Sequence, residues 1–198
     1  MNDKKLTKEE IIAKLEAGNQ RFMSDALENP LRNQPRRDVL TKGQEPDTIV
    51  LSCADSRVVP EVAFDAGLGE LFVVRVAGNI ANTDTIASIE YAVAHVGSQI
   101  IMVLGHEKCG AVTAAVAGGD NGYNLNHLLS HITPAIHACG DGASITEVIK
   151  KNAHLTAKEL TGRSAIIKSA VDSGKVKIIP AYYHLATGEV EILEEVEA

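Results

Sequence analysis

The sequence predicts an α/β fold, in which a central, mostly parallel β-sheet is flanked by helices and preceded by an N-terminal helical arm. Residues 48–52 and 99–104 are short apolar runs rich in β-branched side chains, which is typical of strands buried on both faces of a parallel sheet. Segments with helical spacing separate these runs from further strand-like ones, so right-handed crossover connections are expected. With 198 residues, the chain is long enough for one domain with a substantial core.

An amphipathic helix opens the chain. Thr7 and Glu10 form a capping box for a helix that is predicted to run to about Ser24. Its apolar stripe consists of Ile11, Ile12, Leu15 and Phe22. Residues 29–46 are rich in Pro, Arg and Asn and are interpreted as an extended connector. Residues 1–46 therefore form the arm and connector, and residues 47–198 form the α/β part of a single domain.

The α/β part alternates between strand-like and helical segments. Strands are predicted over residues 48–52, 71–76, 99–104, 176–180 and 189–193, with the last two at or near an edge of the sheet. Helices are predicted after Pro60, over residues 85–96, from Cys109 onward, and over residues 124–139 and 144–173, the last broken near residues 161–162.

Composition excludes several classes of partner. The formal net charge of −7 provides no basic footprint for nucleic acid or for an anionic membrane. No stretch approaches the roughly 20 apolar residues of a spanning helix, and the N-terminus has no apolar signal segment. Three cysteines without a secretion signal favour metal ligation in a reducing compartment over disulfides. We therefore expect a cytoplasmic protein that binds neither nucleic acid nor membrane.

Three potential metal ligands follow two of the predicted strands. Cys53 comes directly after residues 48–52, and His106 and Cys109 come directly after residues 99–104. Open α/β sheets place their sites at the carboxyl ends of strands, and a helix N-terminus at Cys109 favours the thiolate form. Two thiolates and one imidazole suit zinc, and three protein ligands are typical of a catalytic rather than a structural site. Residues 47–198 are therefore predicted to be a zinc-binding catalytic domain.

Asp55 and Arg57 lie just beyond the first ligand. A guanidinium beside a carboxylate keeps it ionised and fixes its orientation. Asp55 could then accept a hydrogen bond from zinc-bound water, or it could turn inward and become the fourth ligand, which would displace the water. The sequence leaves both states open.

The motifs around these residues resemble those of the β-class carbonic anhydrases, and the resemblance extends from Gly18 to Val190. The matching segments are Cys53-Ala54-Asp55-Ser56-Arg57-Val58, Phe72-Val73-Val74-Arg75-Val76-Ala77-Gly78-Asn79 and Gly105-His106-Glu107-Lys108-Cys109-Gly110-Ala111-Val112. The resemblance implies that Cys53, His106 and Cys109 hold Zn²⁺ and that Asp55 and Arg57 form a catalytic dyad. It also implies a carbon dioxide pocket lined by Gln44, Phe72, Tyr91 and Gly110.

The expected activity is the reversible hydration of carbon dioxide to bicarbonate and a proton, by attack of zinc-bound hydroxide. The resemblance also implies a homodimer or homotetramer, with the pocket near the subunit interface and an exposed stripe of the N-terminal helix wrapping a neighbour. One alternative is a hydrolase of carbonyl sulfide or carbon disulfide on the same scaffold. Another is a non-catalytic zinc-stabilised binding module, which requires a fourth protein ligand; Cys139 is the only remaining cysteine.

A subgroup of this family carries an inhibitory bicarbonate site. That site includes a tryptophan three residues before the first zinc cysteine. This chain has Val50 at that position and contains no tryptophan. Arg75 matches another part of the site. The sequence therefore does not favour this form of regulation.

Overall fold

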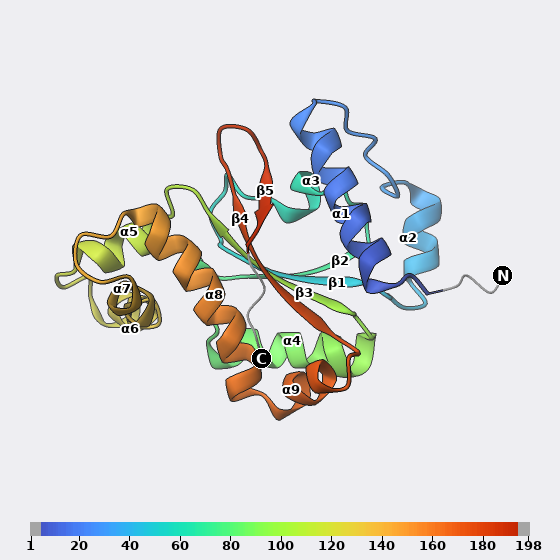
Figure 1. Cartoon of the computed structure of the whole chain (residues 1–198). Helices are drawn as coiled ribbons and strands as arrows, with labels where there is room; N and C mark the ends of the chain where they lie inside the picture. Colours follow the sequence, from blue (N-terminus) through green and yellow to red (C-terminus); the bar gives the residue numbers. More distant parts are fainter. Residues whose placement is uncertain (1–4, 194–198) are drawn as a thin grey trace.

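Five strands form a single sheet in the computed structural model, which describes residues 5–193 (Figure 1). The strand order is β2-β1-β3-β4-β5, with bounds β1 Thr48–Ser52, β2 Leu71–Arg75, β3 Ile100–His106, β4 Lys177–Tyr183 and β5 Val190–Ile192. The first four strands run parallel, and only β5, at one edge, runs antiparallel to β4. This confirms the mostly parallel sheet and the edge positions predicted for the last two strands.

Helices cover both faces of the sheet. Their bounds are α1 Lys8–Met23, α2 Gln34–Leu40, α3 Pro60–Ala63, α4 Thr83–Tyr91, α5 Gly110–Ala117, α6 Tyr123–Ser130, α7 Thr133–Cys139, α8 Ile145–Arg163 and α9 Ala165–Asp172. In Figure 1, α1, α2 and α3 lie on one side of the sheet and α4 to α9 on the other. Every residue of β1 and β3 is buried between these layers, as the apolar runs predicted. Among the described residues, no helix is both long enough and apolar enough to cross a membrane.

Helix α1 packs against the sheet of its own chain. The predicted capping box of Thr7 and Glu10 is present, and the helix ends at Met23. Its stripe is not exposed, because Ile11 and Leu15 are buried against the sheet. Asn19 is buried as well; its side chain donates to the carbonyl of Ala63 and accepts from the backbone N–H of Val190. The expectation of a free stripe available to a neighbour is therefore wrong for Ile11 and Leu15.

The main differences between prediction and structure concern three segments; the other predicted strands and helices are present with shifted ends. Residues 29–46 contain α2, which begins where the Asn33 side chain accepts a hydrogen bond from the N–H of Arg36. Residues 124–139 form two helices, because α6 ends at Ser130 and α7 begins before Pro134, which suits a first turn. The break in residues 144–173 falls at Ser164 rather than at residues 161–162, since the Ser164 hydroxyl caps α9.

Candidate active site

The sheet brings the three predicted ligands together. Cys53 follows β1, His106 ends β3, and Cys109 is the N-cap of α5. Because β1 and β3 are parallel neighbours with Ser52 opposite Leu104, their carboxyl ends meet at one edge of the sheet. The two Sγ atoms and a ring nitrogen of His106 all lie within 4.8 Å of one another, and all three residues are buried.

The His106 ring is oriented with one nitrogen toward the cluster. Its Nδ1 lies 2.9 Å from the carbonyl oxygen of Glu107, so this nitrogen carries the hydrogen and donates it. Nε2 then has a free lone pair. It is one of two buried side-chain polar atoms that lack a hydrogen-bond partner among the described residues. A buried acceptor without a partner is unfavourable, so the Nε2 lone pair fits a metal ligand.

The two thiols interact directly. A hydrogen bond from the Cys109 thiol holds the pKa of Cys53 well below its usual range, and the backbone N–H of Gly78 also donates to the Cys53 Sγ at 3.3 Å. The Cys53 thiolate in turn raises the pKa of Cys109. Without a cation the pair therefore holds one negative charge, and a bound metal cation would favour a second. The donor set fits a thiolate-binding metal.

Asp55 and Arg57 form a bidentate pair beside the cluster. Nε of Arg57 donates to Oδ1 of Asp55 at 2.9 Å, and Nη2 donates to Oδ2 at 2.7 Å. The guanidinium holds the pKa of Asp55 well below its usual range, so the carboxylate is ionised at neutral pH. Asp55 Oδ2 lies 3.8 Å from His106 Nε2. Arg57 thus binds both carboxylate oxygens of Asp55.

No fourth protein ligand joins the cluster within residues 5–193. Cys139 ends α7 and is not part of the group of His, Cys, Asp and Glu side chains that could hold a metal. Cys139 also forms no disulfide in the described part of the chain. A closed four-ligand centre, which the binding-module alternative requires, is therefore not formed by Cys139.

Within one chain, most of the predicted pocket residues lie away from the cluster. Gly110 is the first residue of α5, next to Cys109. Gln44 is exposed and precedes β1, whereas Cys53 follows it. Phe72 lies opposite Ile49, four residues before Cys53, which corresponds to roughly 13 Å along the strand. Tyr91 ends α4 and lies with its ring centroid 6.4 Å from that of Phe72.

Arg75 supports the loop that carries the site. Its guanidinium donates to the carbonyls of Cys53 at 3.0 Å, Asp55 at 2.6 Å and Val58 at 2.8 Å. These acceptors are backbone atoms of a folded loop, so no sequence pattern could have indicated the contacts. Asn152 was missed for the same reason, since its side chain donates to the backbone carbonyl of Gly78, whose N–H donates to Cys53 Sγ.

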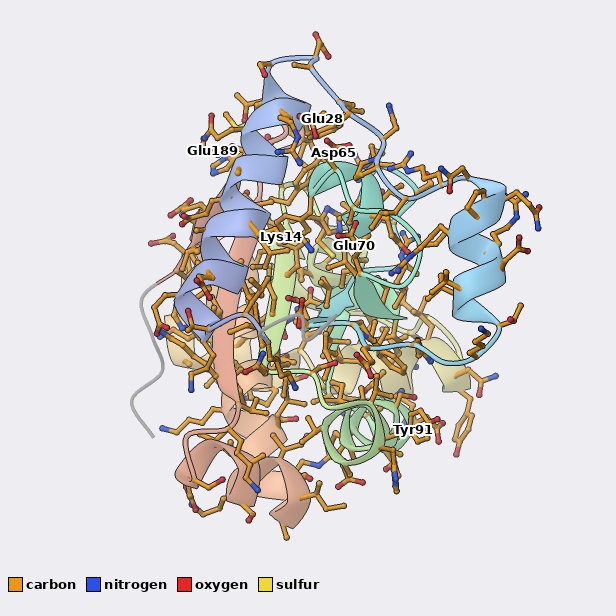
Figure 2. All side chains as sticks on the ribbon, turned by 90° about the vertical axis from the view of Figure 1, so that its right-hand side faces the viewer. Lys14, Glu28, Asp65, Glu70, Tyr91 and Glu189 are labelled. Carbon is orange, nitrogen blue, oxygen red and sulfur yellow. The ribbon has the colours of Figure 1, made fainter. Side chains whose placement is uncertain are left out.

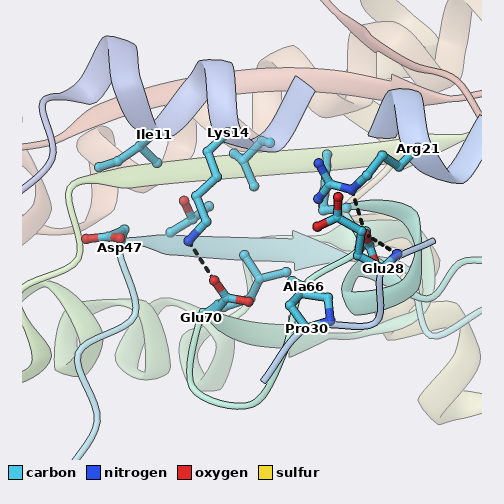
Figure 3. Close-up of a pocket in the computed structure, with 13 residues that line it drawn as sticks. Ile11, Lys14, Arg21, Glu28, Pro30, Asp47, Ala66 and Glu70 are labelled. Atoms are coloured by element: carbon cyan, nitrogen blue, oxygen red, sulfur yellow. Dashed lines mark hydrogen bonds and ion pairs between the residues drawn. The ribbon is translucent and has the colours of Figure 1, made fainter. Parts of the chain in front are cut away.

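A separate cavity of about 220 Å³ lies beneath α1 (Figure 3). Two ion pairs line it, one between Lys14 and Glu70 at 2.7 Å and one between Arg21 and Asp65 at 2.7 Å. None of the three cluster residues belongs to its lining. The cavity is therefore distinct from the candidate metal site.

Comparisons with known proteins place this chain in a family. A model of the family described as carbonic anhydrase matches residues 48–190. Carbonic anhydrase 2 of Mycobacterium tuberculosis is 34% identical over 188 residues, which cover 92% of this chain and 91% of the relative. The carbonic anhydrase of Mycolicibacterium smegmatis is 37% identical over 185 residues, which cover 90% and 89%.

Solved structures share the fold. A chain of the tetrameric β-carbonic anhydrases of Sordaria macrospora superposes with a TM-score of 0.74 at 22% identity, covering 96% of this chain and 100% of that chain. The protein described here therefore belongs to the carbonic anhydrase family and has the β-class fold. This confirms the resemblance on which the expectations of fold and enzyme class depended.

Proposed function

We propose that Cys53, His106 and Cys109 hold a catalytic zinc ion, at which the enzyme hydrates carbon dioxide reversibly to bicarbonate and a proton. The observation that carries this proposal is the buried, unpartnered Nε2 of His106 beside two thiol sulfurs. Thiolate and imidazole together favour zinc over the harder Mg²⁺ and Ca²⁺. Three protein ligands leave one position for the reactants. Bound zinc supplies Lewis acidity, which makes water acidic enough to act as a nucleophile near neutral pH.

Asp55 orients the attacking water. Its carboxylate is ionised and accepts hydrogen bonds, and Oδ2 faces the cluster at 3.8 Å from His106 Nε2. Arg57 prevents the carboxylate from turning further inward, because it binds both oxygens. An O–C bond forms between water and carbon dioxide, and the proton released from the water passes to solvent buffer.

We propose that a second copy of the chain completes the carbon dioxide pocket. Among the described residues, β2 has a partner on one side only, and four of its five side chains are half-buried. Tyr91 is 53% exposed and lies at α4, on the other side of the sheet from α1 (Figure 2). A two-fold contact along β2 would place the partner's Phe72 near the Arg75 end of this strand, next to Cys53. The assembly is then a homodimer or homotetramer.

A cytoplasmic location fits the same chemistry. Two thiols must stay reduced to bind zinc. We therefore propose that the enzyme works in the cytoplasm.

The activity is tested with the zinc-loaded protein by stopped-flow measurement of the pH change after mixing with carbon dioxide. We expect hydration, with a rate that rises with pH as the water ionises. Sulfide release from carbonyl sulfide and carbon disulfide is measured in parallel. Sulfide release without hydration would assign the site to a sulfur hydrolase instead. Inactivity toward all three substrates would contradict a catalytic role.

A further inference from the structure

Asn152 is a buried polar side chain on the core-facing side of α8. It is only 2% exposed, and the neighbouring residues Ile149 and Ala153 belong to the apolar core. Its Nδ2 donates a hydrogen bond of 2.9 Å to the carbonyl oxygen of Gly78. A buried amide among apolar side chains is unfavourable unless it is hydrogen-bonded. The bond to Gly78 therefore offsets part of the cost of burying the Asn152 side chain.

Gly78 connects Asn152 to the metal cluster. Its backbone N–H donates to Sγ of Cys53 at 3.3 Å. Its φ of +73° is readily adopted only by glycine, and a Cβ atom at this position would lie 2.9 Å from Cδ1 of Ile132. A side chain is therefore strained where the backbone approaches the sulfur.

The segment before Gly78 is also held in place. The N–H of Val76 donates to the carbonyl of Ser52 at 3.1 Å, and the N–H of Asn79 donates to the carbonyl of Val76 at 3.0 Å. These bonds fix the segment on the β1 side, and Asn152 fixes the Gly78 carbonyl from α8. The direction of the Gly78 N–H thus depends on both anchors.

We infer that Asn152 is a positioning residue for the Cys53 thiolate, acting through the backbone of Gly78; this inference rests on the proposed zinc centre. An N–H donor draws charge from a thiolate and fixes the sulfur in place, which sets how strongly the sulfur donates to a metal. Without Asn152, the Gly78 carbonyl loses its anchor and the N–H no longer points steadily at Sγ.

The test uses the full chain loaded with Co²⁺, whose thiolate charge-transfer absorption reports on sulfur donation. Asn152→Leu removes the donor at similar volume, and Asn152→Ala removes it together with most of the side chain. Thr156→Val is the matched control, one turn further along the buried face of α8. Metal affinity is measured by competition with a chelator, and folding by circular dichroism.

We expect both Asn152 variants to shift the charge-transfer band to longer wavelength and to bind metal about 10-fold more weakly. Thr156→Val should keep the parental spectrum and affinity. If Asn152→Leu does not fold, Asn152→Ala still provides the comparison. Parental spectra and affinities in folded Asn152 variants would overturn the inference, since Asn152 would then be only structural. Absence of thiolate charge-transfer absorption in the parent protein would instead contradict the zinc centre itself, and the inference with it.

Discussion

Asp55 Oδ2 accepts a hydrogen bond from Arg57 Nη2 at 2.7 Å, and the same oxygen lies 3.8 Å from the unpartnered Nε2 of His106. In the proposed zinc site, Arg57 would hold the carboxylate within a short movement of the metal without placing it there. The pair would then decide whether the fourth position is open to reactants or filled by Asp55.

Replacing Arg57 should close the site. In Arg57→Ala, Asp55 is free to turn toward the cluster and occupy the fourth position, so we expect zinc to be retained and hydration to fall about 100-fold. Arg57→Lys keeps the charge but not the bidentate geometry, so its hydration rate should lie between those of the parent enzyme and Arg57→Ala. Zinc content is measured by mass spectrometry, and activity by stopped flow. Arg37→Ala, an exposed arginine of α2, is the control; a near-parental rate in Arg57→Ala would refute the dyad.

The metal should depend on Cys109 and not on Cys139. Cys109→Ala removes one of two sulfur ligands, so zinc should fall from about one per chain to near zero. Cys139→Ser changes a cysteine outside the cluster and should keep both zinc and activity. Loss of zinc in Cys139→Ser would show that the centre is closed by a fourth protein ligand.

Mixing two inactive variants should restore activity if the pocket is shared between chains. Asp55→Ala disables the chain that carries the metal, and Phe72→Asp disables the chain that contributes the pocket wall. In a mixed dimer one site has both residues intact, so random reassembly should recover about a quarter of the parental rate. Stopped-flow assays of the separate and the refolded, mixed variants provide the comparison. No recovery in verified mixed dimers would place the pocket within one chain.

The Arg21–Asp65 pair should stabilise the fold in a pH-dependent way. Burial raises the pKa of Asp65, but hydrogen bonds from Arg21 and from the backbone N–H groups of Glu28 and Asn29 outweigh it and leave the pKa below its ordinary value. A lowered pKa in the folded state gives stability that is present above the unfolded value, near 4, and is lost as the pH falls through the folded value.

Asp65→Asn should therefore reduce the free energy of unfolding by about 1–3 kcal/mol at pH 7, and by less at pH 3. Asparagine tolerates the left-handed backbone at this position, where φ is +46°, so the change isolates the charge and its hydrogen bonds. Urea titrations measure the effect. Asp172→Asn removes an exposed ion pair with Lys168 and should cost no more than about 0.5 kcal/mol. An equal loss of the free energy of unfolding in Asp65→Asn and Asp172→Asn would contradict the stabilising role of the Arg21–Asp65 pair.

The sequence predicted the parts of the fold that local patterns encode. The apolar run of residues 48–52 predicted β1 to the residue, and the strand ends predicted that Cys53 and His106 would meet. Helix α2 was missed because Asn33 and Pro35, at its start, also favour turns. Arg75 and Asn152 act on backbone carbonyls of distant segments, and no sequence pattern records which carbonyls will face them.

The most direct test of the account is a crystal structure of the zinc-loaded enzyme at neutral pH, with the metal located by anomalous scattering. We expect zinc bonded to Sγ of Cys53 and Cys109 at about 2.3 Å and to Nε2 of His106 at about 2.0 Å. The fourth ligand should come from outside the protein, and Asp55 should remain bound to Arg57. A zinc ion held by Asp55 or by any other fourth side chain, or bound elsewhere in the molecule, would contradict the open centre.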